Sequence, residues 1–436
     1  MTESPAGHPE PGAPGAPGAA APGRDLRFAL LAAAVGLEAA GIGVLFPLLA
    51  HLQRIHHLPT YSLGLMSGAS FFAALFAQLG AGPFLDRAGG QRLLLGGLVL
   101  GAAGLVWFAF AGNLTQLVVA RALGGVGYGI VQPAALRQAS VGVTGARRGQ
   151  RIGVLSSAQM VGISMGPLFG SVLYTLGGIR LPFEVVAAGI IAVGAGVVAA
   201  PKPRPARSAP ASPSPAAGAT ALATAGAGNG RRHIGGVPVS GIVLVALLGA
   251  AMQLPYGLYD ALWSRLLTDR GASALLIGLS LTVFGVPFIL LAPIGGRLAE
   301  RRGPLIAAAI GLVLSDCFMA SYGFVRSPEV IIALGVGEAC VAAVATPAGF
   351  AAVNRVFPDQ RIATGQGIYG GSGTIAAGTS AMVGAPVFAA LGAGAAFAGG
   401  ATASAALVVV AVLVGLSRRG QPSAEQQVST MSRVTT

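Results

Sequence analysis

The sequence predicts an all-α membrane protein with 12 transmembrane helices arranged as two pseudo-symmetric six-helix bundles. Three observations lead to this prediction. Of the 436 residues, 54% are hydrophobic and only 9% are charged, whereas a soluble globular protein carries about 25% charged residues. The apolar residues lie in long continuous runs, and the two halves of the chain repeat the same short motifs.

The apolar runs are long enough to cross a membrane. A spanning helix needs about 20 mostly apolar residues, and continuous runs of that length indicate helices and not the alternating segments of a barrel. We predict spans at approximately 26–50, 61–83, 92–111, 115–137, 152–176, 181–200, 238–260, 272–297, 304–325, 328–352, 363–389 and 393–417.

Two stretches of low complexity divide the chain. They are rich in Pro, Gly and Ala, and contain too few bulky apolar side chains to offset the entropy of ordering the backbone. We therefore expect a disordered cytoplasmic tail at 1–24, an N-terminal bundle at 25–200, a cytoplasmic linker at 201–237, a C-terminal bundle at 238–417 and a cytoplasmic tail at 418–436.

The basic residues predict the orientation. An even number of spans places both termini on one side; if that side is the cytoplasm, 21 of the 27 Lys and Arg are cytoplasmic, five are outside, and Arg121 lies within a span. This asymmetry follows the positive-inside rule. We expect a multi-pass protein of the inner (plasma) membrane with both termini cytoplasmic. The net charge of +13 is then a topology signal, and nucleic acid is not an expected partner.

The two halves repeat four short features in the same order, offset by 210–219 residues. Such repeats predict two bundles related by an axis along the membrane normal, with a cavity between them. The first is a G-x-x-x-[D/E]-R-x-G loop. The matching pairs are 82–89 with 296–303, 125–127 with 335–337, 149–150 with 365–366, and 166–167 with 384–386.

Three of these stretches resemble motifs of the major facilitator superfamily, over roughly residues 25–417. GPFLDRAGGQR at 82–92 resembles the loop signature between spans two and three, although Gly90 and Gln91 replace the usual basic residues. RALGGVGYG at 121–129 resembles the fourth-span signature of proton-coupled members. GISMGPLFG at 162–170 resembles the fifth-span signature of the 12-span drug:proton antiporters, with Ser171 where a second Gly is usual. The resemblance implies the major facilitator fold and alternating access.

The repeated loops are candidates for a gate. One interpretation is a pair of solvated turns whose charges only set the topology. The repetition and the resemblance instead favour loops that latch the two halves when the outside is open, because ion pairs between bundles form a bistable contact. The candidate gating residues are Gly82, Asp86, Arg87, Gly89, Arg92, Gly296, Glu300, Arg301 and Gly303.

The fifth predicted span carries small residues on one face. Gly162, Gly166 and Gly170 repeat at four-residue spacing, which allows another backbone to approach closely, and Pro167 permits a kink. Ordinary helix packing explains this spacing, but the resemblance favours a face specific to exporters.

Ionisable residues at membrane depth are the main functional candidates, because a charge there costs about 2.5–3.5 kcal/mol even on insertion scales. We assign proton coupling to Glu38, Arg121 and Glu338. Glu38 ranks first because it is central and lies next to glycines. Burial favours the neutral form of a carboxyl group, so we expect Glu38 to bind the coupling proton, the substrate, or both in alternation. Arg121 alternatively pairs with a carboxylate or snorkels. Asp316 is interpreted as a local polar contact.

Polar and aromatic residues at helical spacing open the C-terminal half and predict one wall of a substrate cavity. Aromatic rings there would hold a lipophilic or cationic compound; the alternatives are an interfacial aromatic belt and a pairing of Asp260 with Arg265. The cavity candidates are Gln253, Tyr256, Tyr259, Asp260 and Trp263, with Gln132 and Gln159 as weaker candidates on spans four and five.

The sequence does not indicate an enzyme, a metal site or a bound cofactor. Cys317 and Cys340 fall in apolar runs and are interpreted as packing residues, and all five histidines are placed outside the predicted spans. The single lysine, Lys202, is not part of a GxxxxGK[ST] phosphate-binding loop, so uphill transport would draw on a proton gradient.

These observations favour a monomeric secondary transporter that exports a small lipophilic or cationic compound, such as a drug or secondary metabolite, in exchange for protons. An importer or a metabolite exporter with the same fold is the alternative. A membrane receptor without transport is less favoured, because it would not need matched loops and buried carboxylates. The expected partners are a small-molecule substrate, protons and the lipid bilayer.

Overall fold

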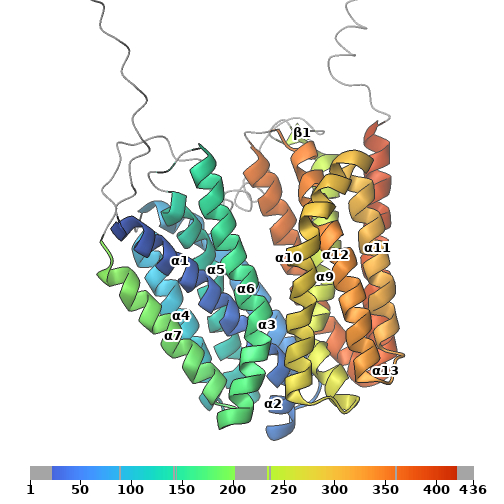
Figure 1. Ribbon diagram of the computed structural model, residues 1–436. Helices are drawn as coiled ribbons and strands as arrows, with labels where there is room; N and C mark the ends of the chain where they lie inside the picture. Colours follow the sequence, from blue (N-terminus) through green and yellow to red (C-terminus); the bar gives the residue numbers. More distant parts are fainter. Residues whose placement is uncertain are drawn as a thin grey trace, which may run out of the picture.

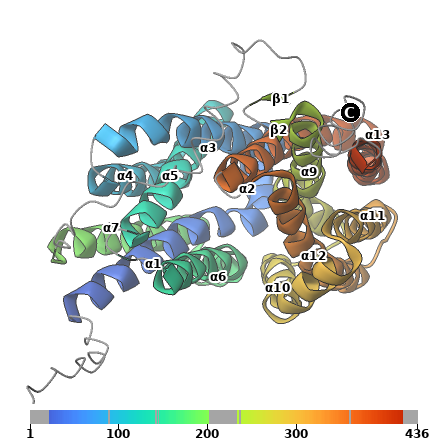
Figure 2. The ribbon, with the colours of Figure 1, turned by 90° about the horizontal axis from the view of Figure 1, so that it is seen from above.

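A computed structural model describes residues 22–87, 90–140, 143, 145–201, 233–234, 237–358 and 361–419. Nearly all of these residues are helical, and the helices form two groups, one from each half of the chain (Figures 1 and 2). The prediction of an all-α protein of two bundles is confirmed.

The N-terminal bundle is formed by the first half of the chain. Its first predicted span is a broken helix, because Pro47, which lacks a backbone donor, lies in a short 3-10 turn between α1 and α2. The elements are α1 (Pro22–Gly43), η1 (Phe46–Leu48), α2 (Leu49–Ile55), α3 (Tyr61–Arg87), α4 (Gly90–Phe110), α5 (Leu114–Ser140), α6 (Gly145–Gly177) and α7 (Leu181–Ala199).

The C-terminal bundle holds five long helices. The last contains Gly392 with φ 85° and ψ 175°, a conformation that a side chain would strain, so α13 is two helices joined at this kink. The elements are α9 (Val239–Asp269), α10 (Ala274–Arg302), α11 (Pro304–Tyr322), α12 (Pro328–Val356) and α13 (Ile362–Arg419).

Two short strands precede α9. β1 (His233–Ile234) pairs antiparallel with β2 (Val237–Pro238), with His233 opposite Pro238. They lie at the end of the linker predicted to be unstructured, so that prediction was wrong at these residues. Residues 202–232 of the linker, and the tails at 1–21 and 420–436, lie outside the described residues.

The helices account for the 12 predicted spans. Ten described segments are long and apolar enough to cross a membrane, and one of them, Ile362–Ser417, contains both of the last two predicted spans. The apolar part of α10, Ala274–Phe288, corresponds to the eighth. Large apolar side chains also cover the outside of the bundles: Leu176, Leu391 and Phe76 are 74%, 72% and 67% exposed. A surface of this kind suits lipid and not water.

The largest boundary error is at the seventh span, predicted to end at 260. Helix α9 continues to Asp269, because Asp260 is buried in an ion pair and Leu262 and Leu266 are buried in the core of the bundle. The sequence shows a charge at 260 but not its partner. Helix α1 begins at Pro22, within the stretch assigned to the N-terminal tail.

The bundles meet along two helix pairs, α6 with α10 and α3 with α13. Glycines permit these contacts: a Cβ on Gly64 would overlap the carbonyl oxygen of Ala381, and one on Gly278 would overlap Ser171. We call the end of the molecule that carries α2 the α2 end, and the opposite end the β1 end. In Figure 1 the two groups of ribbons converge toward the α2 end and diverge toward the β1 end.

Candidate functional site

A buried ion pair joins the two bundles. Arg121, in the second turn of α5, donates from Nη2 to both carboxylate oxygens of Asp260 in α9, at 3.0 and 3.3 Å. The two side chains are only 4% and 2% exposed. Removing two charges from water is costly unless they are paired and hydrogen-bonded, so this contact forms only when the two helices lie together.

Further hydrogen bonds between the bundles lie near this ion pair, toward the α2 end. Ser264 in α9 donates to the Pro47 carbonyl (2.9 Å) and accepts from the Ala50 amide (3.4 Å). Arg265 donates to Gln53 (2.9 Å). Ser171 of α6 donates to the carbonyl of Ala274, the first residue of α10 (2.8 Å). The α2 end is therefore closed by polar contacts as well as by helix packing.

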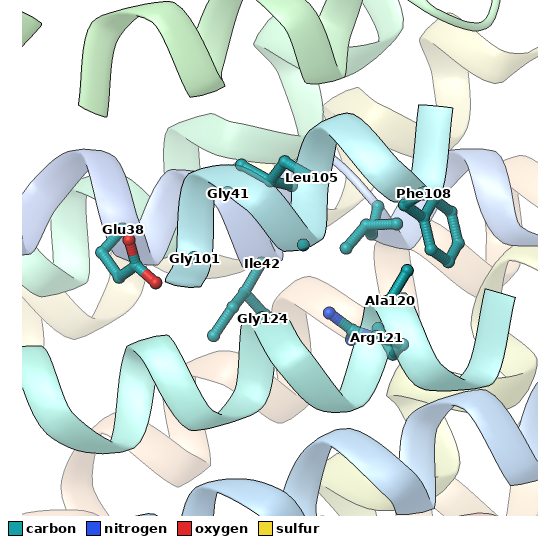
Figure 3. Close-up of a pocket in the computed structure, with 11 residues that line it drawn as sticks. Glu38, Gly41, Ile42, Gly101, Leu105, Phe108, Ala120, Arg121 and Gly124 are labelled. Atoms are coloured by element: carbon teal, nitrogen blue, oxygen red, sulfur yellow. The ribbon is translucent and has the colours of Figure 1, made fainter. Parts of the chain in front are cut away.

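Glu38 and Arg121 line one small cavity inside the N-terminal bundle, between α1, α4 and α5 (Figure 3). The cavity has room for about one water, about 20 Å³. Glu38 is 4% exposed and its Oε2 has no hydrogen-bond partner, and the Nε of Arg121 is also unpartnered.

The carboxyl group of Glu38 depends on a glycine of the neighbouring helix. A Cβ on Gly101 of α4 would overlap the Glu38 carboxylate, so only glycine leaves space for it. A cavity of this size accepts a water or a proton, whereas small-molecule pockets measure about 300–1,000 Å³. Direct binding of the substrate by Glu38, one of the options raised by the sequence, does not fit this conformation.

The two glutamine candidates of the N-terminal bundle bind each other. Gln132 of α5 donates to Gln159 of α6 (2.7 Å), and Gln159 donates to the Tyr128 hydroxyl. Tyr128 was not among the candidates from the sequence, although it lies within the GGVGYG stretch. These polar groups link α5 to α6.

The small-residue face of α6 lies against α1. Cβ atoms on Gly162, Gly166 and Gly170 would meet backbone atoms of Gly36, Gly43 and Val44, respectively. Pro167 belongs to both interfaces, because its ring lies near Gly43 while its carbonyl lies near Gly278 of α10. Helix α6 thus uses one face within its bundle and another between the bundles.

The residues of α9 that were predicted to form one cavity wall differ in their exposure and in their partners. Tyr256 is 38% exposed and Gln253 is half-buried, whereas Asp260 pairs with Arg121. Trp263 is 6% exposed and donates to Ser280 of α10 (3.0 Å), so it is packed inside the C-terminal bundle in this conformation and its cavity role stays a prediction. The proposed pairing of Asp260 with Arg265 was wrong, since Arg265 pairs with Asp269 (2.9 Å).

Glu338 and Asp316 lie in the C-terminal bundle. Glu338 is 3% exposed and accepts hydrogen bonds from Tyr259 and Tyr322, whose rings pack near Trp263. Asp316 is 4% exposed and has one unpartnered oxygen. The two tyrosines form a polar shell for Glu338 that spacing along one helix does not reveal, because Tyr322 belongs to α11.

The gating-loop candidates are only partly described. Gly82, Asp86 and Arg87 lie at the end of α3, and Glu300 near the end of α10, but their side-chain surroundings lie outside the described part, as does Gly89. Arg92 and Arg301 are exposed, Gly296 has open space around it, and Gly303 has a φ of 88°. The latch therefore stays a prediction.

Other chemical candidates are few. Within the described ranges, no group of three or more His, Cys, Asp or Glu is placed to hold a metal ion. Cys317 is exposed and Cys340 is partly buried. His51 was wrongly placed outside the spans: it lies in α2, within the apolar segment Leu26–Ile55, beside the Tyr174 hydroxyl.

Comparison with known proteins assigns the family. The sequence profile of the Major Facilitator Superfamily matches residues 31–264 and 245–432. The chain belongs to the major facilitator superfamily. This is a family of membrane transporters and not of enzymes, and ten described segments of the chain are long and apolar enough to cross a membrane.

Several relatives have names that mention drug resistance or transport. Multidrug resistance protein 2 of Bacillus subtilis is 27% identical over 156 residues, 36% of this chain and 39% of that protein. The multidrug resistance protein MdtG of Proteus mirabilis is 33% identical over 157 residues, covering 35% and 39%. The synaptic vesicular amine transporter of Rattus norvegicus is 32% identical over 133 residues, covering 29% and 26%. The matches span less than two fifths of the length of these relatives.

Solved structures share the fold at low sequence identity. The inward-facing, unoccupied bacterial homolog of the human lysosomal transporter Spinster is 17% identical, with 91% of this chain and 96% of that chain covered and a TM-score of 0.68. The nucleoside transporter NupG is 15% identical, with 89% and 99% covered and a TM-score of 0.67.

Proposed function

We propose that this transporter exports a small lipophilic or cationic compound in exchange for protons. It acts as a monomer in the plasma membrane, with both termini in the cytoplasm. The observation that carries the proposal is the shared position of Arg121: it lines the same small cavity of the N-terminal bundle as Glu38, and it pairs with Asp260 of the opposite bundle.

Protonation of Glu38 provides the coupling. An ionised Glu38 attracts Arg121 within a low-dielectric interior and competes with Asp260 for it. A protonated Glu38 does not, so Arg121 pairs fully with Asp260 and the α2 end closes. The arrangement in the structure, with Glu38 free of ion pairs and the Arg121–Asp260 pair formed, corresponds to the protonated, closed case.

This competition yields exchange in opposite directions. With the α2 end open to the outside, Glu38 takes up a proton, Arg121 turns to Asp260 and the α2 end closes. Glu38 then releases its proton toward the cytoplasm, and the negative charge it gains attracts a cationic substrate that enters from the β1 end. The weakened Arg121–Asp260 pair lets the α2 end reopen, and the substrate leaves outward. One proton enters for each outward step.

The direction and the substrate class rest on separate observations. The asymmetry of basic residues supports a cytoplasmic β1 end, so the end at which the two groups of helices diverge faces inward in this conformation (Figure 1). Tyr256 and Gln253 offer an aromatic ring and an amide on the exposed part of α9. The multidrug resistance proteins and the amine transporter among the relatives support a lipophilic amine or cation.

Inside-out vesicles test the proposal. Vesicles with an acidic lumen should accumulate ethidium or another lipophilic cation only when they contain the protein, and nigericin, which collapses the pH gradient, should abolish the accumulation. Vesicles from cells with the Arg121→Gln variant at equal abundance are the matched control. If the wild-type protein instead moves a panel of cations out of the acidic lumen, it is an importer and the proposed direction is wrong.

A further inference from the structure

A second small cavity lies inside the C-terminal bundle, between α9, α10, α11 and α12. It has room for about one water, about 20 Å³. Its lining includes Tyr256, Tyr259, Phe284, Ser315, Asp316 and Glu338. The described residues that line it include two carboxyl groups and no basic side chain, so nothing in the lining neutralises two negative charges.

Glu338 has the partners of an ionised carboxylate. Tyr259 donates to Oε1 (2.8 Å) and Tyr322 donates to Oε2. Each tyrosine hydroxyl has a single proton, and both are directed at Glu338. Two donated hydrogen bonds stabilise the charged form of a carboxyl group, so Glu338 is the better placed of the two carboxyl groups to carry the negative charge of this cavity.

Asp316 has the surroundings of a protonated carboxyl group. It is 4% exposed, and its Oδ2 accepts no hydrogen bond. Its polar neighbour is Ser404 of α13, which donates its only proton to the carbonyl of Ala251 (3.2 Å). Ser404 has a single proton to donate, so Asp316 receives at most one hydrogen bond from it, whereas Glu338 receives two from the tyrosines.

The same place in the N-terminal bundle also holds a buried carboxyl group. Helices α4 and α11 start 214 residues apart, at Gly90 and Pro304, directly after the repeated loops. With this offset Gly101, which makes space for the Glu38 carboxylate, corresponds to Ser315, next to Asp316. Each bundle therefore contains a cavity with room for about one water, and each cavity is lined by a carboxyl group that has an unpartnered oxygen.

We propose that Asp316 is a second proton-binding residue of this transporter, located in the C-terminal bundle and working beside an ionised Glu338. Two carboxylates that share a cavity without a counter-charge repel each other, so one of them holds a proton in this closed conformation, and a proton is a ligand small enough for this space. The groups that face Asp316 or share its cavity are Tyr256 and Tyr259 from α9, Glu338 from α12 and Ser404 from α13. Helix α10 contributes only the apolar Phe284, and Tyr322 of α11 bonds to Glu338.

The proton moves without any further reactant. The O–H bond of the Asp316 carboxyl breaks, the proton passes to a water in the cavity, and Asp316 becomes a carboxylate; uptake is the reverse. Tyr256 lines the cavity and is itself 38% exposed, so the site lies directly beneath exposed surface of α9. This proposal does not require Glu38 to be the coupling site.

Infrared spectroscopy of the purified full-length protein in lipid nanodiscs tests the proposal, because a protonated carboxyl group gives a C=O stretching band that a carboxylate lacks. Near neutral pH the wild-type protein should show this band, and Asp316→Asn should lose the part that belongs to Asp316. Glu329→Gln, an exposed glutamate at the start of α12, is the control and should change nothing. Asp316→Glu, which keeps the carboxyl group, should keep a C=O band at a shifted frequency. This variant distinguishes loss of the carboxyl group from loss of the band through misfolding.

The outcomes separate this site from Glu38. If Asp316→Asn loses one component of the C=O stretching band and Glu38→Gln loses a different one, the result would support two proton sites. Loss only in Glu38→Gln would overturn the proposal for Asp316 while leaving Glu38 intact. Loss in Glu338→Gln with none in Asp316→Asn would place the proton on Glu338 and would also overturn it.

Discussion

The ion pair between Arg121 and Asp260 makes a quantitative prediction about the closed α2 end. Asp260→Asn keeps the shape of the side chain but leaves the guanidinium of Arg121, 4% exposed, without its counter-charge. Removing one partner of a buried pair costs about 3–5 kcal/mol. This free-energy cost applies only to the closed arrangement, because water reaches Arg121 when the α2 end is open. We therefore expect the ratio of closed to open molecules to fall by roughly 100-fold or more.

Distances across the α2 end measure this ratio. Spin labels at Thr115 of α5 and Glu329 of α12 lie exposed at the α2 end of opposite bundles, in a background with Cys317 and Cys340 replaced by Ser. Electron–electron resonance should show one short-distance population in the wild-type protein and a dominant longer one in Asp260→Asn. The matched control is Asp269→Asn, which breaks an exposed i,i+4 pair with Arg265 and should shift the balance by well under 1 kcal/mol.

A double variant sharpens the test. Arg121→Gln together with Asp260→Asn removes both charges, so no buried charge is left unpaired, and the loss should be smaller than that of Asp260→Asn alone. If Asp260→Asn leaves the distance distribution unchanged, or if the double variant opens the α2 end as far as the single one, the ion pair does not hold the bundles together.

Three further predictions follow from the packing and the charge pattern. Gly101→Ala should displace the Glu38 carboxyl group and abolish proton-driven transport, whereas Gly96→Ala, which has open space around it, should leave transport intact; equal activity of the two would remove Gly101 from the site. Ser171→Ala should weaken the closed α2 end by about 0.5–1.5 kcal/mol, since the Ala274 carbonyl loses a donor, and Ser417→Ala, which breaks only a bond within α13, should have no effect on the same spin-label distances. A reporter fused near residue 220 should report the cytoplasm and one near residue 56 the outside; the reverse result would overturn the orientation.

The fold was predictable because hydrophobic length and repeated motifs are local properties of a membrane chain. Each predicted span corresponds to a helix. The errors arise where tertiary contacts override local composition: α9 extends past Asp260 because a partner 139 residues away neutralises that charge, and the first span bends at Pro47.

The sequence predicted most of the candidate residues but not which of them contact each other. A lone arginine at membrane depth signals that a carboxylate lies nearby, yet the sequence offers Glu38, Asp260, Asp316 and Glu338 as acids. The choice between them depends on how the two bundles meet, which no spacing within one half reveals. Trp263 shares helical spacing with Tyr256, but its ring turns into the C-terminal bundle, because the tyrosines of α9 and α11 give it aromatic partners.

The central claim is that protonation of Glu38 couples proton entry to export, and proton flux measures this directly. Proteoliposomes with a trapped pH-sensitive dye should show proton movement when ethidium is added to the side of the β1 end. Glu38→Gln, at normal abundance and with the same folding stability, should lose substrate-driven proton movement and uphill transport. Glu184→Gln, which changes an acid in the first turn of α7, should behave like the wild-type protein. Undiminished ethidium-driven proton movement in Glu38→Gln would contradict the account.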